Sequence, residues 1–279
     1  MEKIVVDKEY FNIEDTLYCG QLFRFYPFKN GYFIISKDKA CYGYESEDKT
    51  IIECNDEDKE YFYNYFDLDT DYKKIVSSAQ EEKVEILTLA SEKGKGIRIL
   101  KQDSEEMLFS FIVSQNNHIP RIKSLLNKMA ETLGEKREFY GEIYYTFPSY
   151  KSLASKEKSF YSLLGLGYRD QYIVSVAKEL EKGYSLTEIA KQDTENLKKS
   201  LIKLKGVGPK VADCVTLFGF NRFDSFPVDT WIEKLYRENF NGVEKDRNKI
   251  SKYFVDRFKN YSGIYQQYLF HYKRNLENK

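Results

Sequence analysis

Leu204-Lys-Gly-Val-Gly-Pro-Lys-Val-Ala-Asp-Cys214 lies between two segments whose apolar residues repeat with helical spacing. The repeats are Leu197, Leu201 and Leu204 on one side, with Asp193 or Thr194 as the expected cap, and Val211, Val215 and Phe218 on the other. Gly206 and Gly208 favour a tight turn around Val207, because glycine accepts positive φ at little cost. The N–H groups of such a turn suit a DNA phosphate. The stretch predicts a helix-hairpin-helix, although two glycines alone also fit a plain helix–helix turn.

Lys210 is the residue of this stretch that could act as a nucleophile. It stands at the N-terminal end of a predicted helix that is apolar nearly all round. The positive helix end and partial burial would both disfavour the ammonium form. An amine that loses its proton readily is a nucleophile able to form a Schiff base. The alternative is an ordinary exposed lysine that contacts phosphate.

Phe226-Pro-Val-Asp-Thr-Trp231 follows the hairpin and precedes another helical pattern. Asp229 or Thr230 is expected to cap that helix, and Thr230 with Glu233 fits a capping box. A carboxylate fixed at a helix start can also stabilise a developing cation. Both roles for Asp229 stay open on the sequence pattern.

The predicted secondary structure of the chain changes from mainly strands to helices near residue 98. Short strand-like runs alternate with turns before it, including a tight turn at Asn30-Gly31, and one helical stretch spans Asp58 to Phe66. Helical stripes follow from Asp103 onward; they include Ile122, Leu125, Met129 and Leu133 behind Pro120, and Ile264, Tyr268 and Tyr272. We therefore predict an α+β fold. An antiparallel β-sheet domain would span residues 1–98, and an all-helical domain, with two helical subdomains flanking an active-site cleft, would span residues 99–279.

Composition excludes several classes of protein. The 279 residues are 42% hydrophobic, which suffices for a core, and the 44 basic residues balance 44 acidic ones. A membrane span and a signal peptide are not expected, because the longest apolar run is short and the N-terminus is charged. The cysteines are Cys19, Cys41, Cys54 and Cys214, and their spacing suits free thiols rather than a zinc or iron–sulfur site. No cofactor is expected.

These pieces together resemble the helix-hairpin-helix superfamily of DNA glycosylases, whose signature is such a hairpin followed by a Gly/Pro-rich loop and an aspartate. The chain further resembles the 8-oxoguanine DNA glycosylase branch along almost its whole length. The matching segments are Gly20-Gln-Leu-Phe-Arg24, Asp103 to Arg121 with Ser114-Gln-Asn-Asn, Leu164-Gly-Leu-Gly-Tyr-Arg169 and Gly263-Ile-Tyr-Gln-Gln-Tyr-Leu-Phe270.

The resemblance implies a role for each matching position. Lys210 would attack C1′ of the damaged nucleotide, and Asp229 would stabilise the oxocarbenium-like charge. The target base would leave the duplex stack. Gly20 would offer its carbonyl to the N7–H of 8-oxoguanine, while Phe270 and Cys214 would sandwich the ring and Gln266 would bond its Watson–Crick edge.

Other matching residues would hold the rest of the DNA. Asn116 would fill the gap, Arg121 and Arg169 would read the orphaned cytosine, and Tyr168 would act as a wedge. Gly206, Val207 and Gly208 would bind phosphate. No metal is required, but the carbonyls of Ile202, Leu204 and Val207 could coordinate a structural cation. Trp231 and His118 depart from the family pattern, in the phosphate clamp and in the Asn triplet respectively.

The leading expectation is a bifunctional 8-oxoguanine glycosylase with lyase activity at the abasic site. A glycosylase for another lesion, such as an alkylated base, and a non-catalytic helix-hairpin-helix module are the alternatives. The expected partner is double-stranded DNA containing 8-oxoguanine, with no membrane, and a monomer is the default state. A cytoplasmic protein working on chromosomal DNA fits the absence of an address signal.

Overall fold

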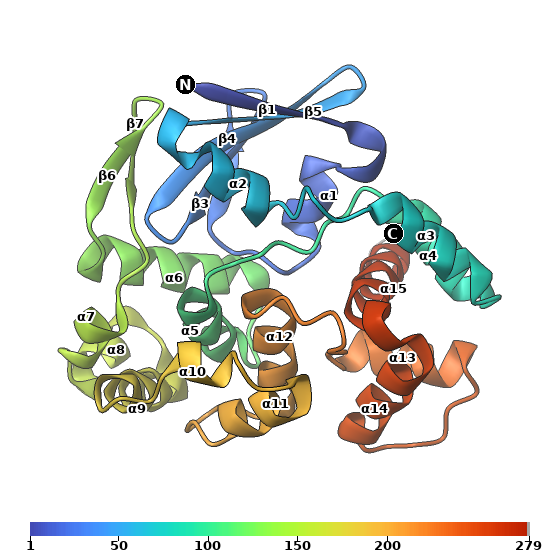
Figure 1. Ribbon diagram of the computed structural model, residues 1–279. Helices are drawn as coiled ribbons and strands as arrows, with labels where there is room; N and C mark the ends of the chain where they lie inside the picture. The colour runs from blue at the N-terminus through green and yellow to red at the C-terminus, as the bar shows by residue number, and fades with distance from the viewer. Residues whose placement is uncertain (278–279) are drawn as a thin grey trace. The chain divides into compact units, whose positions relative to one another are not determined.

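The computed structural model describes residues 1–277, which fall into two compact units (Figure 1). Unit 1 comprises Met1–Leu22, Gly43–Lys101 and the chain from Asn221 onward, and unit 2 comprises Phe23–Tyr42 and Gln102–Phe220. These units interleave along the chain because they group residues by contact, whereas the predicted domains 1–98 and 99–279 group them by type of element. The predicted boundary stays a prediction, and the last two residues of the second domain lie outside the described part.

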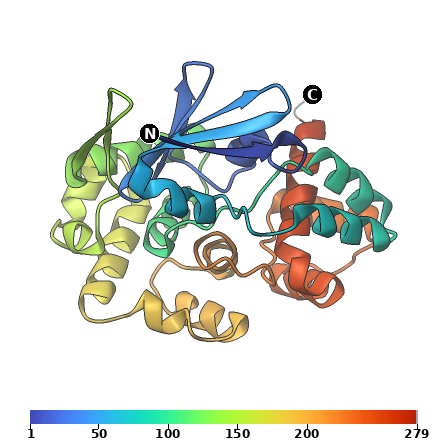
Figure 2. The same cartoon turned by 45° about the horizontal axis from the view of Figure 1, so that its top comes forward.

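A five-stranded sheet runs in the order β1-β5-β4-β3-β2, as predicted for the N-terminal part of the chain (Figure 2). Its strands are β1 (Glu2–Asp7), β2 (Phe25–Phe28), β3 (Gly31–Ser36), β4 (Lys39–Ser46) and β5 (Lys49–Cys54). Strand β1 pairs antiparallel with β5, with Ile4 opposite Ile52. Strand β4 carries the chain from unit 2 into unit 1.

The predicted hairpin turn lies one residue earlier than expected. Phe28 pairs with Gly31, so Lys29 and Asn30 form the two-residue connection between β2 and β3. Lys29 takes the positive φ of +51°. The pairing of buried Phe25 with buried Ile34 sets this register, because a shift by one residue would turn both side chains to the other face.

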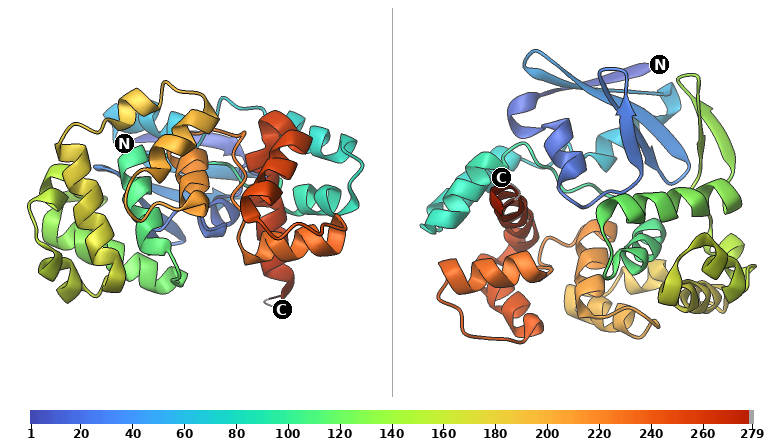
Figure 3. Two further views of the ribbon diagram at one scale, coloured as in Figure 1. Left: turned by 90° about the horizontal axis from the view of Figure 1, so that it is seen from below. Right: turned by 180° about the vertical axis from the view of Figure 1, so that it is seen from behind.

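Unit 1 contains three unpredicted helices, α1, α3 and α4, within the range that was predicted to be a β-sheet domain. Asp71 caps α3 by accepting a hydrogen bond from the Lys74 N–H at 3.0 Å. Helix α4 packs beside α15, where Figure 3 shows the teal and dark-red helices together. Ile264 and Tyr268 of the predicted stripe are fully buried in α15. The helices are α1 (Ile13–Tyr18), α2 (Lys59–Tyr65), α3 (Tyr72–Glu81), α4 (Glu85–Lys93), α13 (Thr230–Asn239), α14 (Arg247–Phe258) and α15 (Ser262–Glu277), with short 3-10 turns at Lys8–Tyr10, Asp56–Asp58 and Lys259–Tyr261.

Unit 2 is mainly helical, as predicted, but it also contains a hairpin that was not predicted. The strands β6 (Lys136–Phe139) and β7 (Glu142–Tyr145) pair antiparallel. Pro120 stands in the first turn of α6, and Asp193 caps α11 by accepting from the Asn196 N–H at 2.9 Å, as expected. The helices are α5 (Ser104–Ser114), α6 (Ile119–Leu133), α7 (Tyr150–Ala154), α8 (Lys158–Leu164), α9 (Asp170–Glu181), α10 (Leu186–Ile189), α11 (Thr194–Ile202) and α12 (Pro209–Gly219), with a 3-10 turn at Gly167–Arg169.

The core of unit 2 fixes helix α12. Phe111 of α5 stacks on Phe218 of α12 with ring centroids 5.6 Å apart. Gly219 allows this approach, because a Cβ there would lie 3.0 Å from the Met107 side chain and 3.2 Å from Ser104 Cα. Buried aromatic contact of this kind holds a helix axis firmly. The start of α12, which carries the hairpin and Lys210, is therefore attached to a rigid helix pair.

The buried histidine of α15 makes the stability of unit 1 depend on pH. His271 is 8% exposed, and its Nε2 lies 3.0 Å from Asn275 Nδ2 and 3.7 Å from Asp15 Oδ1. Burial lowers the pKa of His271 to about 4. The imidazole therefore stays neutral in the folded protein at pH values where an unfolded chain would already bind a proton.

We expect the protein to lose stability as the pH falls from 6.5 to about 4, because the unfolded state takes up a proton at His271 before the folded state does. The loss attributable to this group is at most about 3 kcal/mol of unfolding free energy. His271→Gln should flatten that part of the slope in urea titrations at several pH values. An identical slope in wild type and variant would contradict the assignment.

Candidate functional site

The residues predicted to form the site belong to both units, and each group is described by itself. Unit 1 carries the carboxylate and the proposed purine-binding residues other than Cys214, and unit 2 carries Cys214, the hairpin, the lysine and the opposite-base residues. The first group is Gly20, Asp229, Gln266 and Phe270; the second is Asn116, Arg121, Tyr168, Arg169, Ile202, Leu204, Gly206, Val207, Gly208, Lys210 and Cys214.

Helices α11 and α12 with their connection form the predicted helix-hairpin-helix. Gly206 has a φ of +87°, and a Cβ there would lie 2.3 Å from Tyr172 Cγ. Both the backbone conformation and the close approach therefore require glycine. Val207 is buried and donates its N–H to the Leu204 carbonyl at 3.0 Å. Gly208 is the N-cap of α12 and leaves the first-turn N–H groups without a side-chain cap.

Lys210 lies on the first turn of α12 and is exposed. The partial burial expected from its apolar helix is wrong, because the buried residues of α12 begin at Val211. Cys214 lies one turn later and is 3% exposed. Residues four apart share a helix face, so the lysine and the thiol lie on one side of α12. The Lys210 amine is accessible to a large ligand, whereas the Cys214 thiol is buried one turn further along the same face of the helix.

Asp229 has the capping role that the sequence predicted. Its carboxylate accepts the Ile232 N–H at 2.9 Å and caps α13. The predicted capping box of Thr230 with Glu233 is not formed, because the N-cap of α13 is Asp229 and the Glu233 carboxylate pairs with Arg237 at 2.8 Å. A capping bond of this type fixes the orientation of the carboxylate at the start of α13.

Gly20 and Phe270 approach each other closely in unit 1. Gly20 follows the C-terminal end of α1 with a φ of +93°, and a Cβ there would lie 3.3 Å from Phe270 Cε1. Gln266, one turn before Phe270 on α15, is 5% exposed. Its Oε1 has no hydrogen-bond partner within the described chain. An unpaired buried amide oxygen is costly, which is typical of a group that awaits a ligand.

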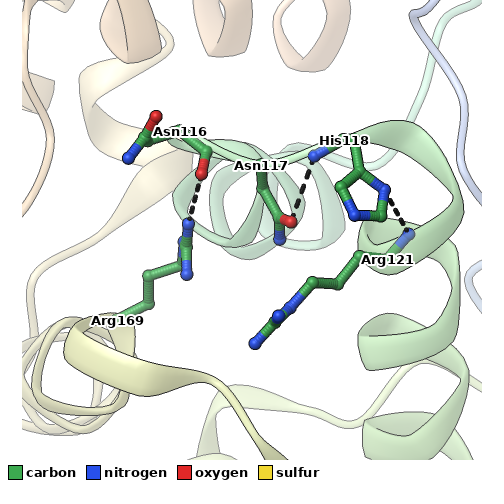
Figure 4. Close-up of a pocket in the computed structure, with 5 residues that line it drawn as sticks. All are labelled: Asn116, Asn117, His118, Arg121 and Arg169. Atoms are coloured by element: carbon green, nitrogen blue, oxygen red, sulfur yellow. Dashed lines mark hydrogen bonds between the residues drawn. The ribbon is translucent and has the colours of Figure 1, made fainter.

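The loop between α5 and α6 is held by Arg169. Asn116 stands exposed with a φ of +47°, and its carbonyl accepts from Arg169 Nη2 at 2.9 Å (Figure 4). The same guanidinium donates through Nε to the Gln115 carbonyl at 2.9 Å and through Nη1 to the Leu166 carbonyl at 3.2 Å. Arg169 is 5% exposed, so its donors serve the loop backbone in this structure.

A cavity of about 480 Å³ opens beside this loop. Figure 4 shows the five residues that line it, which are Asn116, Asn117, His118, Arg121 and Arg169. His118 caps α6 by accepting the Arg121 N–H at 3.4 Å, so the departure from an Asn triplet keeps a capping acceptor. Arg121 donates to the Gly165 carbonyl at 3.1 Å. The cavity is lined almost wholly by hydrogen-bonding side chains.

Gln115 connects this cavity to the hairpin. The Gln115 side chain donates through Nε2 to the Gly206 carbonyl at 2.9 Å. The backbone carbonyl of Gln115 accepts from the Tyr168 hydroxyl at 3.3 Å. Tyr168 is 46% exposed and lies under the Arg169 guanidinium, 4.5 Å from Cζ to the ring centroid. No sequence pattern predicts the bond from Gln115 to Gly206, because the two residues are 91 positions apart in the chain.

The structure adds three findings about residues 1–277. No group of three or more His, Cys, Asp or Glu side chains in this range is arranged to hold a metal ion. All four cysteines are buried free thiols, as expected. None of the helices in the same range is long and apolar enough to cross a membrane.

The sheet, the helical hairpin and the lysine on its second helix define the class of helix-hairpin-helix DNA glycosylases. Residues 3–108 match the family model described as the 8-oxoguanine DNA glycosylase N-terminal domain. The structure of MBOgg1 with a low-affinity DNA ligand is similar at a TM-score of 0.93 and 36% identity, covering 99% of this chain and 96% of that one.

Two further relatives come from named organisms. The 8-oxoguanine glycosylase/lyase of Clostridium acetobutylicum, solved with duplex DNA containing cytosine opposite 8-oxoG, is similar at a TM-score of 0.91 and 32% identity over 98% of both chains. The N-glycosylase/DNA lyase of Saccharomyces cerevisiae is 28% identical, covering 90% of this chain and 73% of the yeast protein. The chain belongs to the 8-oxoguanine DNA glycosylase family.

We expect Arg169→Met to destabilise unit 2 by about 2 kcal/mol, because the substitution leaves the carbonyls of Gln115 and Asn116 without their charged donor. Arg121→Met is the matched control, since Arg121 lines the same cavity but is exposed and donates to one carbonyl only. Denaturant unfolding and hydrogen exchange of residues 114–118 would measure both. Equal losses in the two variants would show that Arg169 does not hold the loop.

Proposed function

We propose that this protein excises 8-oxoguanine from duplex DNA and then cleaves the strand at the abasic site. The observation that supports it best is the exposed Lys210 on the first turn of the second hairpin helix, in a chain of this family. An exposed amine beside a phosphate-binding hairpin can reach a sugar carbon of bound DNA. A hairpin that served only to bind DNA would not need a nucleophile there.

The proposed chemistry begins with attack of Lys210 Nζ on C1′ of the damaged nucleotide. The Nζ–C1′ bond forms as the C1′–N9 bond breaks, and the base leaves with the electron pair and takes up a proton. Asp229 would stabilise the positive charge that develops on the sugar. The sugar then opens to an imine with the lysine, and loss of a C2′ proton expels the 3′ phosphate by β-elimination.

The damaged base would be recognised by residues of unit 1 together with Cys214. The Gly20 carbonyl would accept the N7–H that distinguishes 8-oxoguanine from guanine, and Phe270 would stack on the ring. Gln266 would bond the Watson–Crick edge, which agrees with its buried and unpaired Oε1. A base must leave the duplex for such recognition.

The cavity in unit 2 would receive the orphaned cytosine. Asn116 would fill the gap, Tyr168 would wedge beside it, and Arg121 would donate to the O2 and N3 acceptors of the cytosine. Arg169 would donate to the same base through those guanidinium N–H groups that do not already donate to the loop carbonyls. The protein would bind as a monomer to chromosomal DNA.

The hairpin of Gly206, Val207 and Gly208 would bind phosphate through the N–H groups of its two glycines, because the Val207 N–H already donates to the Leu204 carbonyl. The carbonyls of Ile202, Leu204 and Val207 are proposed to coordinate a structural cation. The Leu204 carbonyl already accepts the Val207 N–H, so only its second lone pair would be available.

Borohydride trapping tests the lysine and the substrate together. Wild-type protein should form a covalent adduct with a duplex carrying 8-oxoguanine opposite cytosine and none with the undamaged duplex. Lys210→Gln should lose the adduct while still binding the lesion duplex, because it lacks the attacking amine. Lys205→Gln is the matched control, since Lys205 is an exposed lysine of the same hairpin, and it should keep the adduct.

Other outcomes would point to the alternative functions. Base release without an adduct would indicate a monofunctional glycosylase and reduce Lys210 to a phosphate contact. Activity only on an alkylated-base duplex would replace 8-oxoguanine as the substrate. Binding without release of any base would favour a non-catalytic DNA-binding module.

We also expect binding to weaken steeply with salt, because phosphate contacts release counterions. The apparent Kd for the lesion duplex should rise severalfold between low and moderate potassium chloride, as measured by fluorescence anisotropy. An affinity that does not change with salt would contradict a DNA-backbone interface at the hairpin.

A further inference from the structure

Helix α15 faces the end of α1 with a stripe of three side chains. Gln267, Phe270 and Arg274 follow the i, i+3, i+7 spacing that places residues on one helix face. Gln267 Nε2 donates to the Cys19 carbonyl, and Arg274 Nη2 donates to the Tyr18 carbonyl. These carbonyls at the end of α1 have no partner within their own helix, so α15 supplies the donors.

The residue after Gly20 is anchored just as firmly. Gln21 is fully buried, and its Nε2 donates to the Arg98 carbonyl at 2.7 Å. Its Oε1 accepts the Leu100 N–H at 2.8 Å. Gly20 is therefore a single flexible residue between two fixed segments. The direction of its carbonyl depends on how those segments are held.

Arg274 contacts both the backbone at the end of α1 and the aromatic ring of Phe270. Its Cζ lies 5.2 Å from the centroid of the Phe270 ring, a cation–π distance. Its Nη1 would lie 3.5 Å from a Cβ built on Gly20. Burial lowers the pKa of Arg274 from its ordinary value, while the nearby charge of Asp229 raises it. An arginine stays charged under such opposing effects.

We infer that Arg274 is a positioning residue for recognition of the damaged base, because its guanidinium holds the Tyr18–Gly20 backbone and the Phe270 ring in one fixed arrangement. This inference rests on the base pocket proposed above. A purine stacked on Phe270 can donate its N7–H to the Gly20 carbonyl only if the ring and the carbonyl keep a set spacing. Sub-ångström placement of this kind depends on supporting contacts around the residues that touch the ligand.

A purely structural role for Arg274 predicts a different result. Capping α1 and packing on Phe270 would stabilise unit 1, and loss of the residue would lower all activities together. Positioning acts only while a base occupies the pocket. Cleavage of a DNA strand that already contains an abasic site involves no base, so it separates the two roles.

The test compares two single-turnover rates in each variant. One is release of 8-oxoguanine from a duplex with cytosine opposite the lesion, and the other is cleavage of the same duplex carrying an abasic site. Arg274→Met should lower base release about tenfold relative to abasic-site cleavage, the size expected when a hydrogen bond from a charged donor is lost. Arg274→Lys keeps the charge but lacks the planar face, and it should lie between Met and wild type.

Arg257→Met is the matched control. Arg257 lies on α14 of the same unit, with its Cζ 5.4 Å from the Phe240 ring centroid, so it loses a similar arginine–phenylalanine contact away from Gly20. Its ratio of base release to abasic-site cleavage should equal that of the wild type. Thermal unfolding of each variant shows whether it is folded, and Arg274→Lys serves if the Met variant is not.

Three results would overturn the inference or its basis. A ratio for Arg274→Met within about twofold of the wild type, or an equal fall of both rates, would show that Arg274 is only a structural cap. A matching change in Arg257→Met would show that the effect is general to unit 1. Failure of the wild type to release 8-oxoguanine while it still cleaves abasic sites would overturn the proposed substrate instead.

Discussion

The guanidinium of Arg169 is the contact on which the functional loops of unit 2 depend. It is buried, and it donates to the carbonyls of Gln115, Asn116 and Leu166. The carbonyls of Gln115 and Asn116 lie in the connection between α5 and α6, where no regular helix or strand supplies their donors. With the backbone fixed, the Gln115 side chain reaches the Gly206 carbonyl. One buried charge thus sets the geometry of the asparagine loop, and through that loop it also supports the hairpin.

In unit 1 the backbone at a proposed site residue is also held in place, but by a different set of contacts. There the central residue is Gly20, whose positive φ would strain any other residue and whose Cβ position lies 3.3 Å from the Phe270 ring. Its surroundings must therefore supply the rigidity that a side chain would otherwise provide. Buried Gln21 on one side and donors from α15 on the other perform that task. The contrast is between a loop fixed from its centre by one arginine and a glycine fixed from both flanks.

The parts of the fold that the sequence predicted are those governed by neighbouring residues. Asp193 and Asp229 each cap a helix by accepting the N–H of the residue three positions later, and such bonds can be recognised in a short stretch of sequence. The burial of Lys210 could not be judged in this way, because an apolar helix can still begin in solvent. Helix α3 was missed although Asp71 is a readable cap. Arg274 was also missed, because its partner lies 256 residues earlier in the chain.

The interleaving of the two units has a consequence for biosynthesis. Unit 2 ends at Phe220, so every segment it needs has been synthesised while the last fifth of the chain is still to come. Unit 1 cannot close until α15 leaves the ribosome, since the Gln267 contact to Cys19 joins residues 248 apart. The N-terminal segment of unit 1 therefore lacks its contacts with α15 until that helix has been synthesised. Ribosome-bound chains that end before α15 should therefore expose the apolar surface of α4 to chaperones while the hairpin is already formed.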